Sequence, residues 1–298
     1  MDATRRPFGQ GLRILDGGTG SELRRRGVQL SDACWSATAN LSDPELLLEI
    51  HRDFIRAGAD VVTANTFATS RFVLAAAGLE DSFDAINRAA ISAARSAARE
   101  AGRDVEVAAS LSCFPPAFDA GAYPAQDTEY RAYAELAEHC ADAGVDLILL
   151  EMLQHPEHAA LACRAARESG LPFWAGVSCR RRAATDELVA FDDPGQPLGA
   201  VLDAVLPFEP DGIAVMHSPV EVIPAAIAEV VQRWSGPIGA WAGIPYVEDP
   251  DCQDDRQIRP EAYATAARAW IAAGAVLVGG CCGTTPEHIR ALAELRQG

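Results

Sequence analysis

The chain is organised around the run AVLVGGCCGTTPEHI, residues 275–289, close to its end. Its apolar residues and two glycines indicate a buried strand that leads directly to two adjacent cysteines, Cys281 and Cys282. Thr285 is suited to cap a helix whose first position is Pro286, because proline lacks the amide hydrogen that would be unpaired there. The run therefore predicts a strand that presents two thiols at its carboxyl end, just before a helix.

The thiol pair predicts a metal site. Adjacent cysteines form a disulfide only within a strained ring, so a shared metal ion is the expected use of the pair, and two buried structural thiols are the alternative. No C-x-x-C motif occurs in the chain. A catalytic zinc needs three protein ligands, and the candidates for the third are His217, Cys179 and Cys113. Imidazole favours His217, although a lone histidine is often structural.

Composition narrows the class of protein. A hydrophobic fraction of 49% with 22% charged residues is typical of one large folded domain, and 298 residues accommodate a barrel of about 250. The net charge of −17 comes from 42 acids against 25 bases, and every base is arginine because the chain has no lysine. Such a charge disfavours nucleic acids and anionic membranes. Without lysine, Schiff-base enzymes and phosphate-loop nucleotidases are excluded.

Location and assembly are only partly constrained. No secretory signal opens the chain, and no run approaches the roughly 18 apolar residues of a membrane span, so we expect a cytoplasmic protein. In that compartment the eight cysteines should be thiols or metal ligands. The sequence leaves the oligomeric state open, a homo-oligomer included.

Eight apolar segments alternate with helical patterns, which predicts a single (β/α)₈ TIM barrel over 11–298 with a loose arm at 1–10. The competing fold is an open doubly wound sheet, which usually carries G-x-G-x-x-G, a spacing that GGTG at 17–20 lacks. An exposed loop is expected at 247–257. The predicted strands are 13–16, 60–65, 105–111, 146–151, 172–178, 212–216, 237–241 and 276–279. After a first helix opened by a Thr19–Glu22 capping box, the predicted helices are 42–58, 70–101, 128–143, 156–169, 198–206, 220–234, 261–273 and 286–295.

Polar side chains gather where these strands end, which is where barrels place their reactive groups. Asp16 and Glu151 end the first and fourth strands, and two carboxylates at one mouth suit an ammonium group or proton transfer. Hydrogen bonding to the amides of the following turns is the alternative. The other candidates at strand ends are Asn65, Thr66, Phe67, Cys113, Cys179, Met216, His217, Trp241, Cys281 and Cys282.

Four motifs, in the same order over about residues 12–295, resemble the homocysteine S-methyltransferases. They are DGGTGSEL at 16–23, ANTF at 64–67, EM at 151–152 and GGCCGTTPEHI at 279–289. That family includes betaine- and S-methylmethionine-dependent enzymes and the homocysteine module of methionine synthase. The resemblance implies a (β/α)₈ barrel, a zinc ion and methyl transfer to a thiol to give methionine. It assigns Cys281 and Cys282 to zinc and Asp16 and Glu151 to the ammonium of the amino acid, and it adds Gly17, Asn65, Thr66 and Phe67 as substrate-binding residues.

The sequence departs from the family pattern at two strand ends. The family takes its third zinc ligand from a cysteine at the end of strand six, whereas the alignment on Ser218 and Pro219 places Met216 and His217 there. His217 is offset by one residue, so the predicted zinc set is Cys281, Cys282 and His217, with Cys179, Cys113 or no third residue as alternatives. After strand seven, a proline-asparagine element is replaced by residues 241–243.

The sequence thus predicts a zinc-dependent S-methyltransferase that moves a methyl group from a small sulfonium or quaternary ammonium donor to homocysteine. One barrel uses the whole chain, which leaves no cobalamin or folate module, so we expect a diffusible donor. Aromatic candidates for a cation-π wall around it are Phe67, Trp241, Tyr246 and Trp35. The alternatives are methylation or demethylation of another thiol or a selenol, and a homologue that binds metal or an amino acid without turnover.

Overall fold

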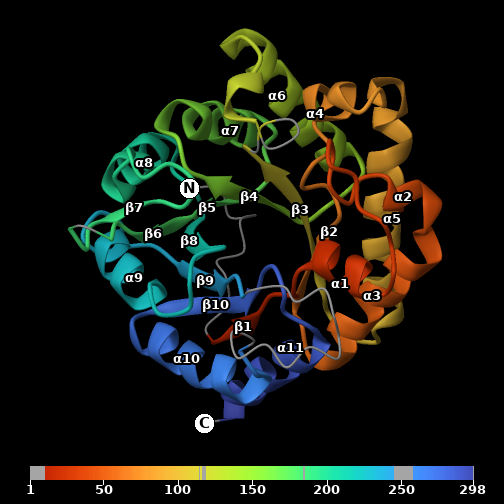
Figure 1. Cartoon of the computed structure of the whole chain (residues 1–298). Coiled ribbons are helices and arrows are strands. Elements are labelled where there is room, and N and C mark those ends of the chain that lie inside the picture. The colour runs from red at the N-terminus through yellow and green to blue at the C-terminus, as the bar shows by residue number, and fades with distance from the viewer. Residues whose placement is uncertain (1–10, 114, 116–118, 184, 245–257, 298) are drawn as a thin grey trace.

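The computed structural model describes residues 11–113, 115, 119–183, 185–244 and 258–297. The predicted arm at 1–10, the predicted loop at 247–257 and Tyr246 lie outside the described residues. The described chain forms a ring of strands surrounded by helices (Figure 1).

All neighbouring strands of the ring run parallel, in the order β1-β10-β9-β8-β5-β4-β3-β2. A parallel bridge between Leu15 and Val61 joins the two ends of this order, and the Asp16 amide donates to the Val61 carbonyl at 3.0 Å. The sheet is therefore closed, which confirms the (β/α)₈ barrel and excludes the open doubly wound sheet. The strands are β1 (Arg13–Ile14), β2 (Val61–Ala64), β3 (Glu106–Ser112), β4 (Leu147–Leu153), β5 (Phe173–Val177), β8 (Gly212–Met216), β9 (Ile238–Ala242) and β10 (Ala275–Gly280).

The interior of the barrel is filled by side chains rather than open. Trp174 and Trp241 are at most 1% exposed and pack with apolar residues from the surrounding strands. Gly212 makes room for the Trp174 ring, because a Cβ at residue 212 would lie 2.4 Å from that ring. A packed interior leaves the carboxyl ends of the strands as the place for a cavity.

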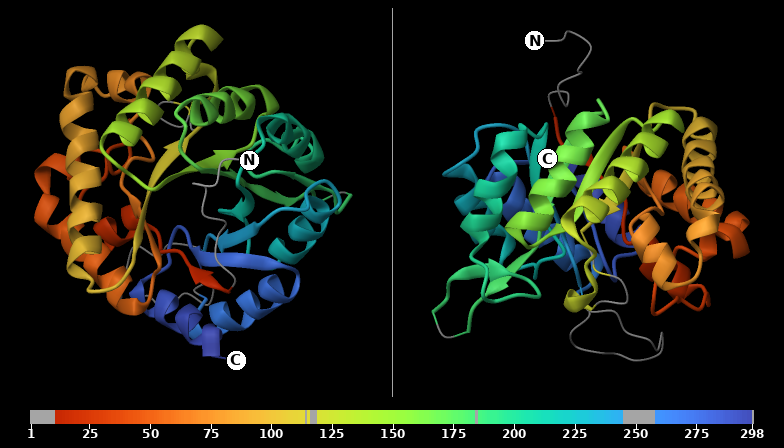
Figure 2. Two further views of the ribbon diagram at one scale, coloured as in Figure 1. Left: turned by 180° about the vertical axis from the view of Figure 1, so that it is seen from behind. Right: turned by 90° about the horizontal axis from the view of Figure 1, so that it is seen from above.

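Helices cover the outside of the ring, as the two further views show (Figure 2). Within the described residues, none of them is both long and apolar enough to cross a bilayer. They are α1 (Thr19–Arg25), α2 (Ala39–Ser42), α3 (Pro44–Ala57), α4 (Arg71–Ala76), α5 (Phe83–Glu100), α6 (Gln126–Asp142), α7 (Pro156–Glu168), α8 (Leu198–Val205), α9 (Ile223–Val231), α10 (Pro260–Ala272) and α11 (Pro286–Ala293). Short 3₁₀ turns lie at Glu80–Ser82, Ala120–Ala122, Leu206–Phe208 and Glu294–Gln297.

Two helix predictions were wrong in detail. The single helix expected at 70–101 is two helices, α4 and α5, because Gly78 adopts a left-handed φ of 67° after α4. The Thr19–Glu22 capping box does not form: Gly18 precedes the helix, and the Glu22 carboxylate instead accepts hydrogen bonds from Arg25 and Arg26. The predicted cap of the last helix is confirmed, because α11 begins at Pro286 with Thr285 as its N-cap.

The sequence did not predict the hairpin that follows β5. Beyond β5, the strands β6 (Cys179–Arg181) and β7 (Leu188–Ala190) pair as an antiparallel hairpin outside the barrel sheet. Its returning strand leads back toward the ring at Phe191 and Asp192, before α8 begins. This hairpin contributes to the site described below.

Candidate functional site

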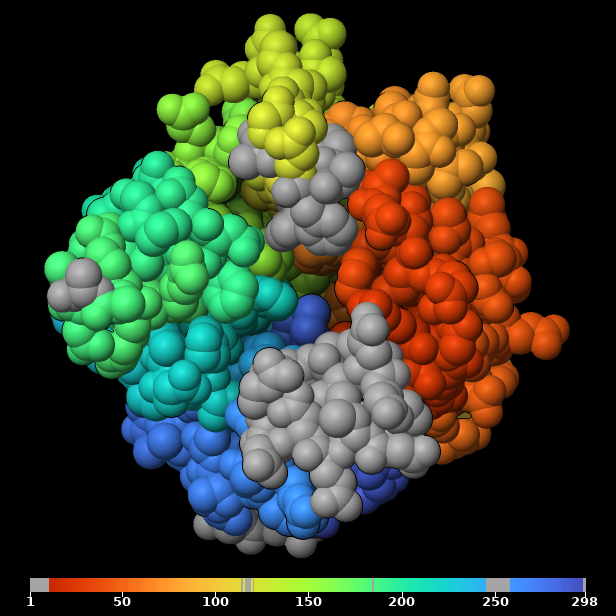
Figure 3. Space-filling model, in the orientation of Figure 1, coloured from red at the N-terminus to blue at the C-terminus, as the bar shows by residue number. Residues whose placement is uncertain are grey.

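A cavity of about 240 Å³ lies at the carboxyl ends of the strands. The space-filling view shows the molecule hollowed near the centre of this face (Figure 3). Of the residues predicted at strand ends or for the substrate, those in the lining are Asp16, Gly17, Asn65, Phe67, Glu151, Met216, His217, Cys281 and Cys282. Thr66 is not among them. The structure therefore brings together all the predicted metal ligands and both predicted carboxylates.

Two thiols and one imidazole lie together in the lining of the cavity. The Sγ atoms of Cys281 and Cys282 are 4.0 Å apart, and Cys281 Sγ lies 3.5 Å from Nδ1 of His217. All three potential ligand atoms lie within 4.8 Å of one another. Zinc bonds of about 2.3 Å to sulfur and about 2.0–2.1 Å to nitrogen, arranged tetrahedrally, separate two sulfurs by about 3.8 Å and sulfur from nitrogen by about 3.6 Å. The two measured spacings match these edges, so the residues fit a zinc ion with three protein ligands.

The turn after β10 fixes the two thiols. The Cys281 amide donates to the Ala242 carbonyl at 3.2 Å, which keeps the chain in register with β9. The Thr284 hydroxyl donates to the Cys281 carbonyl at 2.7 Å, and a Cβ at Gly280 would lie 2.1 Å from that hydroxyl oxygen. Only glycine at 280 therefore permits the tight turn that holds both cysteines at the end of the strand.

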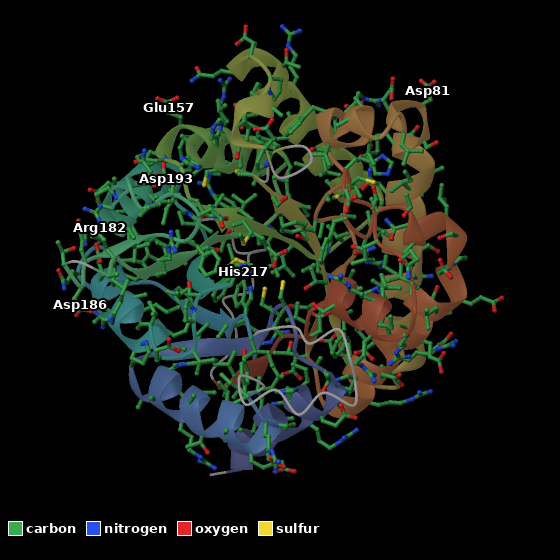
Figure 4. All side chains as sticks on the ribbon, in the orientation of Figure 1. Asp81, Glu157, Arg182, Asp186, Asp193 and His217 are labelled. Carbon is green, nitrogen blue, oxygen red and sulfur yellow. The ribbon has the colours of Figure 1, made fainter. Side chains whose placement is uncertain are left out.

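His217 reaches the thiols because the backbone turns sharply after β8. Its φ is 49°, in the left-handed region, and its amide donates to the Trp241 carbonyl at 3.0 Å. The edge of the Phe191 ring packs against the imidazole, with ring centroids 4.9 Å apart. Figure 4 shows His217 at the centre of the ring with sulfur atoms beside it. The one-residue offset seen in the sequence is thus absorbed by an unusual backbone conformation.

Met216 is not placed as a ligand. Its thioether sulfur accepts hydrogen bonds from the Met152 amide at 3.4 Å and from the Ser178 hydroxyl at 3.1 Å. The other two candidates for a third ligand, Cys113 and Cys179, are buried away from the cavity lining. Among the residues that the structure describes, His217, Cys281 and Cys282 form the one group of this kind.

The thiols and the imidazole also interact with one another. A hydrogen bond from Cys281 lowers the pKa of Cys282, and the same bond raises the pKa of Cys281. Burial alone would lower the pKa of His217, but the hydrogen bond and charge of Cys282, with a smaller contribution from Asp192, raise it overall. Together these groups already favour one thiolate beside a protonatable imidazole.

Asp16 also lines the cavity. It is 1% exposed, and its two oxygens accept hydrogen bonds from the Thr63 amide at 2.7 Å and the Thr63 hydroxyl at 2.9 Å. The partners therefore come from β2 rather than from the turn after Asp16. Burial is the largest cause that raises the pKa of Asp16, to about 8, and Thr63 only partly offsets it. A buried carboxyl group with so high a pKa is ready to ionise beside a cation.

Glu151 lies in β4 and also lines the cavity. The Ser110 hydroxyl donates a short hydrogen bond to one of its oxygens. Burial raises the pKa of Glu151 to about 7, and the charge of Cys282 adds to the shift. Met152, the next residue, has a left-handed φ of 59°, and the register between β4 and β5 shifts between Leu150 and Leu153. This irregularity ends the regular ladder where the carboxylate enters the cavity.

The ANTF motif contributes mainly structure. The Asn65 side chain is fully used, because it accepts from the Ser36 hydroxyl at 2.7 Å and donates to Asn40 at 2.7 Å. The Thr66 hydroxyl donates to the Ser110 carbonyl at 2.7 Å, and Thr66 is not among the lining residues, so its role in substrate binding stays a prediction. Phe67 does line the cavity.

The aromatic candidates divide. Trp35 lines the cavity with Phe67, whereas Trp241 belongs to the packed interior of the barrel and is not in the lining. Trp35 approaches closely because residue 20 is glycine: a Cβ there would lie 2.3 Å from the indole nitrogen. Two of the three aromatic candidates that the structure describes therefore line the cavity.

Sequence reasoning missed Thr19 and Asp192. Both line the cavity. The Thr19 side-chain oxygen is buried without a hydrogen-bond partner among the described residues. The run LVA at 188–190, followed by a DDPG turn, was the signal for the hairpin that carries Asp192, but it is too short to distinguish a strand from a loop.

Comparisons with known proteins agree with this site. The family model described as homocysteine S-methyltransferase matches residues 13–296. Homocysteine S-methyltransferase YbgG from Bacillus subtilis is 29% identical over 95% of this chain and 93% of its own. Selenocysteine Se-methyltransferase from Brassica oleracea is 25% identical over 95% of this chain and 89% of its own. The metallated crystal form of the homocysteine methyltransferase MmuM from Escherichia coli superposes with a TM-score of 0.74 at 26% identity, covering 96% of both chains. The chain therefore belongs to the homocysteine S-methyltransferase family, whose members are methyltransferases.

Proposed function

We propose that this protein transfers a methyl group from a small sulfonium or quaternary ammonium donor to homocysteine, giving methionine, with a zinc ion held by Cys281, Cys282 and His217. The observation that carries the proposal is the spacing of the three ligand atoms, 3.5 Å and 4.0 Å along two edges, in a cavity that two buried carboxyl groups also line. The metallated crystal form of the similar methyltransferase MmuM supports the binding of a metal ion.

The proposed metal centre and the carboxyl pair would bind different parts of homocysteine. When bound, zinc supplies a positive charge that lowers the pKa of a coordinated thiol from about 8.5, so that the thiolate is present at neutral pH. Asp16 and Glu151 would bind the ammonium group of the amino acid. Because both pKa values are raised, to about 8 and about 7, these carboxyl groups lose protons as the ammonium enters.

Methyl transfer requires no further acid or base in this scheme. The thiolate sulfur attacks the methyl carbon, a new S–C bond forms, and the bond from that carbon to the donor sulfur or nitrogen breaks. The donor leaves as a neutral thioether or tertiary amine. Phe67 and Trp35 in the lining offer aromatic faces to a cationic donor, and none of the described lining residues is an arginine.

A selenol acceptor is the second candidate. It is favoured by one observation, the similarity to a selenocysteine Se-methyltransferase over most of both chains. The same cavity would serve either acceptor, since a selenol also binds soft metals as its anion. Binding without turnover is disfavoured because the ligand set and the carboxylate pair are both complete.

The test combines zinc content with methionine formation. Wild-type protein, His217→Ala and Cys179→Ala are loaded with zinc, dialysed, and assayed with homocysteine or selenocysteine and a panel of donors: S-methylmethionine, S-adenosylmethionine, betaine and a dimethylsulfonium compound. We expect about one zinc per chain in the wild type and in the Cys179→Ala control, and loss of most zinc from His217→Ala. Full zinc retention in His217→Ala would exclude that ligand, and no methionine with any donor would exclude homocysteine as the acceptor.

A further inference from the structure

We propose that Asp192 is a specificity-determining residue that contacts the positively charged group of the methyl donor at the mouth of the cavity. The inference rests on the proposed function and names the residue that selects the donor by charge. It follows from where the β6–β7 hairpin delivers this carboxylate, how the carboxylate is held, and which charges surround it.

The hairpin brings Asp192 to the part of the cavity that contains His217. Phe191, its neighbour, packs edge-on against His217 with ring centroids 4.9 Å apart, and the Phe191 amide donates to the Ser178 carbonyl at 3.2 Å. Asp192 lines the cavity yet is exposed to solvent, so it lies at the rim rather than in the interior. A donor that approaches a sulfur held beside His217 must pass this rim.

A buried amide fixes the orientation of Asp192. The Gln154 side chain is only 5% exposed and donates from Nε2 to Oδ2 of Asp192 at 2.7 Å. In return, the Asp192 amide donates to Oε1 of Gln154 at 2.6 Å. The other carboxylate oxygen, Oδ1, accepts no hydrogen bond from the described residues. Immobilising an exposed aspartate costs side-chain entropy, and this reciprocal pair leaves one oxygen available to a ligand.

The charges of the cavity point to a cationic ligand. Asp16, Glu151 and Asp192 all line it, and none of the described residues in the lining is an arginine. Thr19, at 9% exposed, also lines the cavity with a hydroxyl that has no partner among the described residues. A buried polar group without a partner indicates that the protein surface is completed by a bound molecule.

The three carboxylates serve different parts of the reaction. Asp16 and Glu151 are buried and are assigned above to the ammonium of the acceptor. Asp192 stands at the rim beside His217, where the group that leaves the methyl carbon must lie during in-line attack. A donor with net positive charge is attracted there, whereas a donor that carries its own carboxylate close to the cation is repelled.

Asp192 could instead act through His217, as a residue that orients a metal ligand. The structure shows no hydrogen bond between the Asp192 carboxylate and the imidazole, and the two hypotheses differ in what a variant changes. Loss of an orienting residue lowers zinc affinity by about 10- to 100-fold. Loss of a donor contact leaves zinc binding unchanged and raises KM for the donor.

The experiment uses two sulfonium donors that differ in net charge: S-methylmethionine, with one net positive charge, and dimethylsulfonioacetate, with none. Zinc-loaded wild type, Asp192→Asn and Asp193→Asn are compared. Asp193 is the matched control, because it is the adjacent aspartate and does not line the cavity. Initial rates and calorimetric binding of each donor without homocysteine are measured, together with zinc content.

For Asp192→Asn we expect KM and the dissociation constant for S-methylmethionine to rise roughly 3- to 10-fold, with kcat and zinc content unchanged. Values for dimethylsulfonioacetate should stay the same or improve, and Asp193→Asn should resemble the wild type. Gln154→Ala should raise the same KM, and adding it to Asp192→Asn should have little further effect, since both changes remove one interaction.

Three results would overturn the inference: equal losses for both donors, no change with S-methylmethionine, or loss of zinc from Asp192→Asn. If no donor yields methionine in any variant, the proposed function is wrong. The calorimetric arm still decides the role of Asp192 in that event, because unchanged binding of S-methylmethionine by Asp192→Asn would by itself exclude the contact.

Discussion

The carboxyl pair and the proposed metal ligands are positioned in different ways. Asp16 and Glu151 each accept a hydrogen bond from a neighbouring strand: Thr63 of β2 donates to Asp16, and Ser110 of β3 donates to Glu151. The thiols come from the turn after β10 and the imidazole from a left-handed residue after β8, with Phe191, which follows the β6–β7 hairpin, packed against the imidazole. Adjacent strands thus hold the carboxyl groups, whereas turns beyond the strand ends hold the thiols and the imidazole.

This difference has a chemical consequence. The carboxyl pair exchanges protons, so its charge depends on pH and on the bound ligand. The chemistry proposed for the thiols and the imidazole depends on a bound ion. Changes to the carboxyl pair should therefore alter substrate binding with zinc retained, and changes to the thiols or the imidazole should remove both zinc and activity.

The largest effect is expected from Cys281→Ser and Cys282→Ser. Removing a thiolate from a three-ligand site should abolish stoichiometric zinc, and the loss of several kcal/mol of transition-state stabilisation corresponds to a fall of about 10³-fold in kcat/KM. Zinc analysis and initial rates check this, with Cys163→Ala as the control because Cys163 is buried in α7. Either variant keeping full zinc and half of the wild-type rate would contradict the proposed centre.

A smaller effect, confined to the acceptor, is expected from Asp16→Asn and Glu151→Gln. Each variant removes one charge-assisted contact to an ammonium group, so KM for homocysteine should rise about 10- to 100-fold, at about 1.4 kcal/mol per factor of ten. Zinc content should not change. Glu106→Gln, at the start of β3, is the matched control and should behave like the wild type.

The same carboxyl groups predict how acceptor binding depends on pH. At pH 7 most of Asp16 is protonated, since its pKa is about 8, and about one proton per bound amino acid should therefore be released from the pair. Calorimetry in buffers of different ionisation enthalpy measures that number. Proton release that is unchanged in Asp16→Asn would show that the proton comes from elsewhere.

The smallest effect concerns stability without metal or substrate. Both carboxyl groups have a higher pKa in the folded state than their ordinary values near 4, so the folded state binds more protons between about pH 4 and about pH 7 to 8. The contribution of these two groups to the free energy of unfolding is therefore largest at acidic pH. It falls as pH rises, by at most about 1.4 kcal/mol per pH unit for each group. Urea unfolding of the metal-free protein at pH 5 to 8 tests this. We expect a shallower slope in Asp16→Asn than in Glu106→Gln, and equal slopes would refute the assignment.

Most of the barrel was predictable because parallel strands buried on both faces read as short apolar runs, and each of the eight predicted runs overlaps one strand of the barrel. The hairpin was not, because β6 consists of one cysteine and two arginines and β7 of three apolar residues, too few to show a period. The single helix predicted at 70–101 was wrong because an alanine-rich stretch favours helix on both sides of Gly78, and only the turn there separates α4 from α5.

The site was predictable where a residue ends a strand. Asp16, Glu151, Cys281 and Cys282 were placed correctly at the cavity because their neighbours in sequence define the strand ends. Thr66 was expected at the cavity but is not in its lining. Its hydroxyl donates to the Ser110 carbonyl of β3, a contact 44 residues away in sequence. Asp192 was missed because its position depends on Gln154, 38 residues away.

The sequence by itself determined the closed alternation of strands and helices, the thiol pair and the two carboxylates, because each is encoded within a few consecutive residues. Only the tertiary structure decided which side chain joins the thiols. The left-handed turn at His217 is held by the Trp241 carbonyl of the next strand, and Met216 is withheld by hydrogen bonds from Met152 and Ser178. Those contacts join residues far apart in the chain, so no local pattern could encode them.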